Sequence, residues 1–130
     1  VDLVLVDAPC TGTGTWRRNP DAKWRLRPNA LDERVKDQAI VLDRAARFVK
    51  AGGRLVYITC SLLERENDEA VENFLTRHDG FKIKAPKEVA LEAGLPQLQE
   101  CLSPRGAGLL LTPKRCGTDG FFISILVKDK

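Results

Sequence analysis

The sequence predicts an α/β fold with a mostly parallel sheet that carries an antiparallel edge. Two nearly continuous apolar runs, residues 1–6 (VDLVLV) and 54–59 (RLVYIT), are typical of parallel strands that are covered on both faces. A segment with apolar residues at helical spacing separates them, so the order is strand, helix, strand. Two further strand-like segments, 109–112 and 121–127, follow each other closely and favour an antiparallel edge.

The first strand is expected to end at Asp7, because Pro9 cannot donate a hydrogen bond to a strand ladder. A turn rich in glycine and threonine and then a basic loop lead to a helix that should begin near Asn29, a suitable N-cap. Its apolar stripe is Leu31, Val35, Ala39, Leu42, Ala46 and Val49. Gly52 and Gly53 are expected to end this helical segment, as glycines commonly do.

The second strand is expected to end at Cys60, with a helix directly after it. Ser61 and Glu64 fit a capping box, in which the two side chains satisfy backbone donors at the start of a helix. One face of that helix carries Val71, Phe74, Leu75 and His78. A short strand is expected at 81–84. Residues 85–107 hold three of the seven prolines and are expected to meander over the surface.

The composition is that of one ordinary soluble domain. The 130 residues are 43% hydrophobic and 30% charged, which suffices for a single core. No apolar run approaches the roughly 20 residues of a membrane-spanning helix, so a cytoplasmic protein without a membrane partner is expected. Val1 runs straight into a strand, and the neighbouring parallel strands of a complete sheet are missing. We therefore expect the chain to be part of a longer protein.

Basic side chains concentrate between Trp16 and Arg27. Five of them stand against a single acid, Asp21, so this segment carries +4 while the whole chain carries +3. They are Arg17, Arg18, Lys23, Arg25 and Arg27. The segment suits contact with RNA phosphates, with Trp16 or Trp24 near a base. The alternative is a solvated loop that its tryptophans anchor to the core.

The four cysteines form neither a metal site nor a disulfide framework. None is spaced as C-x-x-C and there is one histidine, His78, so no metal is expected. Cys10 and Cys60, however, each follow a predicted parallel strand. Because the carboxyl ends of parallel strands border the ligand crevice of an open α/β sheet, both thiols and the Asp7 carboxylate should converge there. The other two are expected to be reduced and buried: Cys101 and Cys116.

Two thiols and a carboxylate in one crevice fit more than one reaction. Disulfide exchange usually uses C-x-x-C, and a cysteine hydrolase needs a histidine base, whereas His78 is expected at the end of a helix as a packing or capping residue. Pyrimidine alkylation remains, in which a thiolate adds to carbon-6 of cytosine and carbon-5 then accepts a methyl group. A helix N-terminus just after Cys60 would favour its thiolate, although Glu64 and Glu66 offset part of that field.

Three ordered motifs resemble those of the Sun family of RNA cytosine-5 methyltransferases. They are residues 7–14 (DAPCTGTG) with 18–21 (RNPD), residues 52–61 (GGRLVYITCS) with 66–67 (EN), and residues 117–122 (GTDGFF). Together they extend over most of the chain and leave residues 81–107 unmatched. Cys116 departs from the pattern, because the family often has histidine at this position.

The resemblance implies a role for each matched residue. Cys60 is the implied nucleophile, and Cys10 assists release of the methylated RNA. Asp7 contacts the cytosine, and Asp7 and Pro9 border the methionine end of the cofactor, S-adenosylmethionine. The implied substrate is RNA, with ribosomal RNA as the default. Residues 1–130 would be the C-terminal half of a single Rossmann-like methyltransferase domain, whose glycine-rich cofactor loop lies upstream in the family.

Without that loop, the chain is expected to bind S-adenosylmethionine weakly or not at all and to be inactive alone. Two rival interpretations stay open. A non-catalytic RNA-binding scaffold with this fold would be expected to lose Cys60, which is present. A DNA cytosine-5 methyltransferase places its nucleophile in a Pro-Cys pair such as Pro9-Cys10, and would leave Cys60 unexplained.

Overall fold

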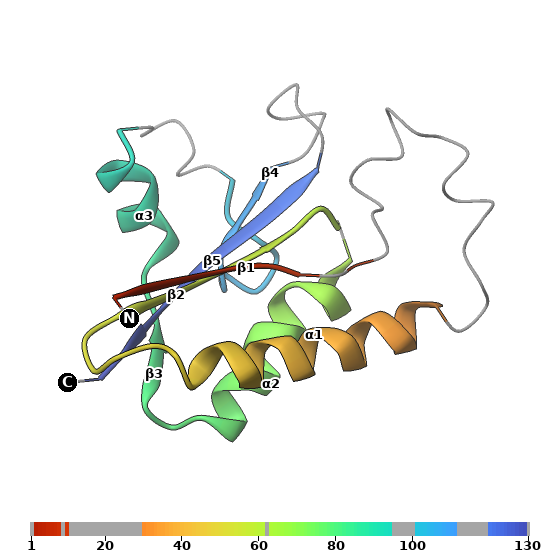
Figure 1. Cartoon of the computed structure of the whole chain (residues 1–130). Coiled ribbons are helices and arrows are strands. Elements are labelled where there is room, and N and C mark those ends of the chain that lie inside the picture. Colours follow the sequence, from red (N-terminus) through yellow and green to blue (C-terminus); the bar gives the residue numbers. More distant parts are fainter. Residues whose placement is uncertain are drawn as a thin grey trace.

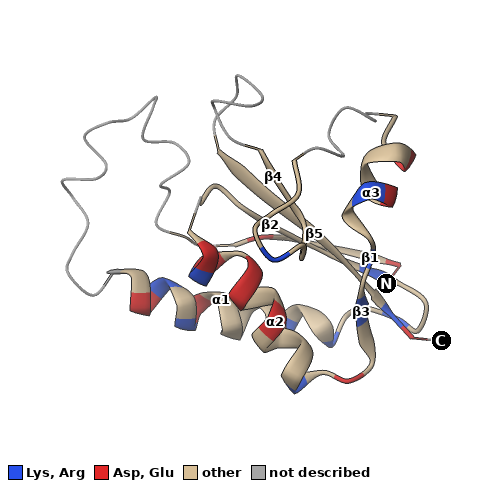
Figure 2. Cartoon of the chain, turned by 180° about the vertical axis from the view of Figure 1, so that it is seen from behind, with Lys and Arg blue, Asp and Glu red and all other residues tan. Residues whose placement is uncertain are grey.

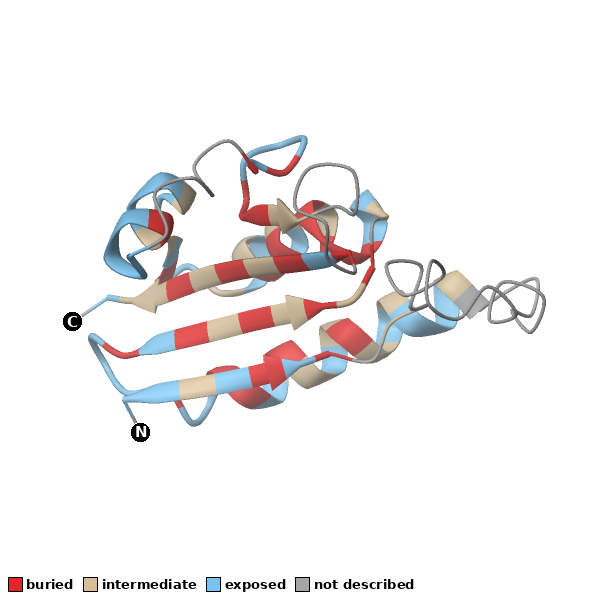
Figure 3. Cartoon of the chain, turned by 90° about the horizontal axis from the view of Figure 1, so that it is seen from above, coloured by how far each residue is buried: buried red, intermediate tan, exposed pale blue. Residues whose placement is uncertain are grey.

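In the computed structural model, the structure describes residues 2–8, 10, 30–61, 63–94, 101–111 and 120–129. These residues form one sheet, with α1 and α2 together on one of its faces (Figures 1 and 3). In chain order, the elements are β1 (Leu3–Asp7), α1 (Ala30–Ala46), β2 (Arg54–Thr59), a 3₁₀ turn (Glu64–Glu66), α2 (Asp68–Arg77), β3 (Phe81–Ile83), α3 (Pro86–Glu92), β4 (Leu109–Leu111) and β5 (Phe121–Lys128).

The strand order is β1-β2-β5-β3, with β4 also paired to β5. β1 and β2 are parallel, whereas β5 is antiparallel to β2, β3 and β4. Among the described strands, β5 alone therefore runs against the common direction. The α/β fold with a mostly parallel sheet and an antiparallel part is confirmed. The reversed strand lies between β2 and β3, so it is an inner strand of the described sheet.

The core lies between the sheet and the two helices that cover it. In β2, every second residue is buried, which turns Leu55, Tyr57 and Thr59 toward α1 and α2. The largest buried apolar side chains are Leu42, Leu55, Tyr57, Phe74, Phe122 and Leu126. The predicted stripe of α1 faces this core, although Val49 is buried just beyond the helix, which ends at Ala46. Gly52 then makes the turn into β2 with a φ of 80°, which suits glycine.

Residues 85–107 were expected to meander over the surface; residues 85–94 are mostly exposed, but they contain a helix that was not predicted, and residues 95–100 lie outside the described residues. Pro86 begins the short helix α3, at the first helical position, where its missing N–H costs no hydrogen bond. In the stretch that leads into β4, residues 102 and 104–106 are exposed, whereas Ser103 and Ala107 are buried: the Asp68 carboxylate accepts hydrogen bonds from Ser103 Oγ (2.6 Å) and from the Ala107 N–H (3.0 Å). The start of α2 therefore holds this segment against the sheet.

Among the described residues, the outer strand β1 has one unpaired edge and one uncovered face. Val4 and Val6 pack toward the core, while Leu3 and Leu5 on the opposite face are 56% and 63% exposed. Figure 3 shows this pattern along β1, at the side of the sheet away from β5. Within the described part of the chain, no helix has the length and apolar character to cross a membrane.

Candidate active site

The two cysteines predicted to meet do so at the carboxyl ends of β1 and β2. The strands are in register from Leu3 opposite Arg54 to Asp7 opposite Ile58, and the Ala8 N–H continues the ladder to the Ile58 carbonyl at 2.9 Å. The segments that follow β1 and β2 therefore leave the sheet side by side.

Cys10 Sγ and Cys60 Sγ lie 3.3 Å apart. A disulfide bond is about 2.05 Å long, so these are two thiols in hydrogen-bond contact. Both residues are half-buried. The arrangement places two reactive sulfur atoms at one edge of the sheet, where each remains partly accessible.

Asp7 lies at the same edge, as the last residue of β1, and is exposed. Alternation along the strand puts its side chain on the face that α1 and α2 leave uncovered. Several other predicted site residues fall outside the described residues: Pro9, Arg17, Arg18, Lys23, Arg25 and Arg27. Cys116, which was expected to be a buried structural cysteine, also lies outside them. Cys101, in contrast, is described and buried, as expected for a structural cysteine.

The capping box expected at Ser61 and Glu64 is wrong. Ser61 Oγ donates instead to Glu66 Oε1 at 2.7 Å and accepts from the Leu63 N–H at 3.1 Å, while Glu64 is exposed. The chain passes through the 3₁₀ turn, and α2 begins only at Asp68. No α-helix therefore starts directly after Cys60. A buried polar cluster takes the place of the expected helix N-terminus.

Glu66 is the centre of this cluster and is fully buried. Its carboxyl group accepts from Ser61 on one oxygen and from Gln38 Nε2 of α1 on the other, at 2.9 Å. Its backbone carbonyl accepts from the Tyr57 hydroxyl at 2.6 Å. Burial, followed by coulombic repulsion from Glu66 and Cys10, raises the pKa of Tyr57, so its hydroxyl stays protonated as a donor.

Asn67 binds the residues on both sides of Cys60. Its Oδ1 accepts from Thr59 Oγ1 at 2.5 Å, and its Nδ2 donates to the Ser61 carbonyl at 2.8 Å. From the sequence, Asn67 was expected only to be part of a motif, and Glu66 only to offset part of the field at Cys60; neither was predicted to hold the segment around Cys60. The only sequence signal for them is that adjacent pair of residues, because the burial that makes them informative comes from α1 and β2.

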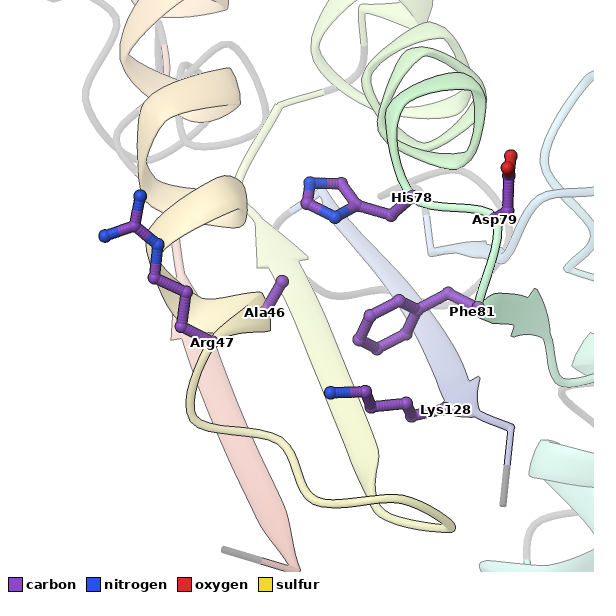
Figure 4. Close-up of a pocket in the computed structure, with 7 residues that line it drawn as sticks. Ala46, Arg47, His78, Asp79, Phe81 and Lys128 are labelled. Carbon is purple, nitrogen blue, oxygen red and sulfur yellow. The ribbon is translucent and has the colours of Figure 1, made fainter.

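His78 has the structural role expected of it. Its N–H caps α2 through the Phe74 carbonyl at 3.0 Å, its ring stacks on Phe74 with centroids 4.4 Å apart, and Nε2 lies 2.8 Å from Asp43 Oδ1. The ring borders a cavity of about 290 Å³ together with Phe81 and Lys128 (Figure 4). Lys128 ends the reversed strand β5, so this cavity lies at the opposite end of the sheet from the thiols. His78 is therefore no base for either cysteine.

Known proteins that resemble the chain do so over nearly its whole length. Residues 1–127 match the family described as 16S rRNA methyltransferase RsmB/F. Ribosomal RNA small subunit methyltransferase B of Pectobacterium carotovorum is 38% identical over 128 residues, which are 98% of this chain and 26% of that protein. The probable ribosomal RNA small subunit methyltransferase B of Bacillus subtilis is 40% identical over 129 residues, 98% of this chain and 27% of that protein.

A solved structure shares the fold. The crystal structure of NSun6 from Pyrococcus horikoshii with SFG has a TM-score of 0.70 and 28% sequence identity, over 97% of this chain and 29% of that one. The chain thus spans about a quarter of the length of the curated relatives it matches. The family match over residues 1–127 confirms the resemblance to the Sun family that the three motifs indicated. The chain belongs to the RsmB/F family of 16S rRNA methyltransferases.

Proposed function

We propose that the full-length protein transfers a methyl group from S-adenosylmethionine to carbon-5 of a cytosine in ribosomal RNA, with Cys60 as the nucleophile. The observation that carries the proposal is the 3.3 Å contact between Cys10 Sγ and Cys60 Sγ at the ends of two parallel strands. In a family of rRNA methyltransferases, two adjacent thiols at the ligand edge of the sheet suit a reaction in which a covalent bond to the base is made and then broken.

The Cys60 thiolate adds to carbon-6 of the cytosine, and the displaced electron pair makes carbon-5 nucleophilic. S-adenosylmethionine, when bound, would supply the methyl group from its sulfonium sulfur to carbon-5 and would leave as the thioether S-adenosylhomocysteine. A base then removes the carbon-5 proton, the carbon-5 to carbon-6 double bond forms again, and the sulfur–carbon-6 bond breaks to return the Cys60 thiolate. Cys10, in contact with Cys60, assists this last step.

Asp7 and Pro9 are the proposed contacts to the base and to the methionine end of the cofactor. Asp7 fits this role because its carboxylate is exposed at the edge of the sheet where Cys60 also lies. SFG, which accompanies NSun6, is an analogue of S-adenosylmethionine, and this supports the choice of cofactor. We propose that the ribose and adenine of the cofactor are bound by residues of the full-length protein outside residues 1–130.

Residues 1–130 are therefore proposed to be the C-terminal part of one catalytic domain. The open edge of β1 and its exposed Leu3 and Leu5 support this, because strands of a parallel sheet are normally buried on both faces. In the full-length protein, further strands would extend the sheet from β1 and helices would cover this face.

This division predicts that the chain of residues 1–130 alone shows no saturable binding of S-adenosylmethionine at micromolar concentration. The reason is that the glycine-rich cofactor loop of the family has no match in residues 1–130, where Gly12 and Gly14 form no G-x-G-x-x-G pattern. Isothermal titration calorimetry checks it, with the full-length protein as the positive control. Micromolar affinity of residues 1–130 would contradict the proposed division.

The RNA is proposed to approach on the side of the basic segment: Arg17, Arg18, Lys23, Arg25 and Arg27. The exposed side of the 3₁₀ turn and α2 is unsuited to phosphates. Acidic side chains gather there (Figure 2), and Arg105 pairs with Glu64, Glu69 and Glu72 on the surface. A ribosomal RNA substrate also fits a cytoplasmic protein.

Trapping with modified RNA tests the proposed function in the full-length protein. In RNA that carries 5-fluorocytosine, carbon-5 has no proton to lose, so the adduct persists after methyl transfer. Tryptic digestion separates the two thiols, because Cys60 lies in residues 55–65 (LVYITCSLLER) and Cys10 in the peptide that ends at Arg17. Mass spectrometry is expected to find the nucleotide on residues 55–65. A nucleotide on the Cys10 peptide would favour the DNA-type chemistry, and RNA binding without any adduct would favour a scaffold.

A further inference from the structure

We propose that Asn67 is a positioning residue for Cys60: it fixes the residues on both sides of the thiol and thereby sets where the sulfur atom stands. The inference rests on the proposed methyl transfer through Cys60. Asn67 itself is 1% exposed and is held within the protein, so it acts through its neighbours.

The strand ladder stops just before the nucleophile. β2 ends at Thr59, which pairs with Phe122 of β5, and on the other side the last ladder bond reaches the Ile58 carbonyl. Cys60 and Ser61 lie beyond this point. Their placement therefore depends on side chains.

Asn67 supplies that support on both sides of Cys60. Thr59 Oγ1 donates to Asn67 Oδ1, and Asn67 Nδ2 donates to the Ser61 carbonyl. Ser61 is further held by its own N–H to Thr59 Oγ1 at 3.3 Å and by its hydroxyl to Glu66. All of these groups are buried, so any rotation of the chain about Cys60 would break hydrogen bonds that water cannot replace.

The chemistry of position 67 calls for an amide. One end of the side chain must accept a hydrogen bond from Thr59 Oγ1, and the other must donate a hydrogen bond to the Ser61 carbonyl, and a planar amide can do both at once. A carboxylate would set an oxygen against the Ser61 carbonyl. Meanwhile Cys60 is half-buried, so its framework is fixed in the interior while its sulfur atom stays accessible.

The experiment compares Asn67→Asp, Thr59→Val and Thr59→Ser in the full-length protein. The measured quantities are the rate of adduct formation with 5-fluorocytosine RNA at saturating RNA and cofactor, and separately the affinity for RNA. Asn67→Asp keeps the shape but loses the donor. Thr59→Val keeps the shape but loses the hydroxyl, whereas Thr59→Ser keeps the hydroxyl and loses only a buried methyl group.

We expect Asn67→Asp and Thr59→Val to slow adduct formation by about 100-fold, the effect of a misplacement near 1 Å, with RNA affinity unchanged. Thr59→Ser should retain nearly the full rate, although it is the variant that leaves a cavity. Equal rates for Thr59→Val and Thr59→Ser would overturn the proposal, and so would a loss of RNA affinity as large as the loss of rate. If Asn67→Asp does not fold, the Thr59 pair still decides the question. A wild-type protein without any adduct at Cys60 would instead overturn the proposed function.

Discussion

Replacing Cys60 by alanine in the full-length protein is expected to lower methyl transfer by on the order of 10⁴-fold or more, the scale seen when the nucleophile of a covalent catalyst is removed. Cys10, whose sulfur lies 3.3 Å from Cys60 Sγ, is proposed to assist release and is not expected to replace the nucleophile. The hydrogen bonds that hold Thr59, Ser61 and Asn67 do not involve Cys60 Sγ. The variant should therefore fold and bind RNA as the wild type does.

Adduct formation with 5-fluorocytosine RNA and methyl incorporation from labelled cofactor are the two measurements. Cys101→Ala is the matched control, since Cys101 is buried beside β4, which β5 separates from β2. It should lose roughly 1 kcal/mol of stability and keep its adduct, whereas Cys60→Ala keeps its stability and loses the adduct. An adduct that survives in Cys60→Ala would assign the bond-forming step to Cys10.

The features that the sequence predicts well are those set by long periodic patterns. The apolar runs of β1 and β2 and the stripe that faces the core from α1 each extend over several residues, so their meaning does not depend on a distant partner. The meeting of Cys10 and Cys60 follows from topology, because parallel neighbours end at the same edge of a sheet. Two thiols at equivalent strand ends were therefore predictable without any side-chain detail.

The features that the sequence misses are decided by long-range burial. Ser61 has two glutamates within reach, Glu64 and Glu66, and the sequence pattern alone favours the first. The structure favours the second, because Gln38, 28 residues away on α1, offers its amide to the Glu66 carboxyl group. The pattern of a capping box carries no information about that partner.

The same limit explains the segment that leads into β4. Residues 86–92 form a helix of only two turns, too short to show a helical period. Further along, Ser103 and Ala107 are held by hydrogen bonds to the Asp68 carboxylate, which is 35 and 39 residues away in the sequence. The prolines and polar residues of this segment are typical of a surface loop, and the sequence does not show that Asp68 binds it.

Replacing Cys10 by alanine is expected to stop the full-length protein after one methyl transfer, with the RNA still bonded to Cys60. Bond formation needs only the Cys60 thiolate, so the first step should proceed. Release requires loss of the carbon-5 proton and cleavage of the sulfur–carbon bond, and proton-transfer assistance of this kind contributes about 10²-fold to 10⁴-fold. With ordinary cytosine in the RNA, a covalent complex should therefore accumulate in Cys10→Ala and stay scarce in the wild type. A denaturing gel with labelled RNA measures the complex, and a methylation time course measures the single turnover.

The contact between the two thiols is symmetric, so the distance alone does not say which one bonds to the base and which one assists. The variants break that symmetry. Cys10→Ala with Cys60 intact should accumulate the complex, and the double variant Cys10→Ala/Cys60→Ala should form none. Wild-type turnover by Cys10→Ala would reduce Cys10 to a turn residue after Pro9. A complex that accumulates in Cys60→Ala instead would exchange the two roles, because the thiol that remains must then be the one bonded to carbon-6.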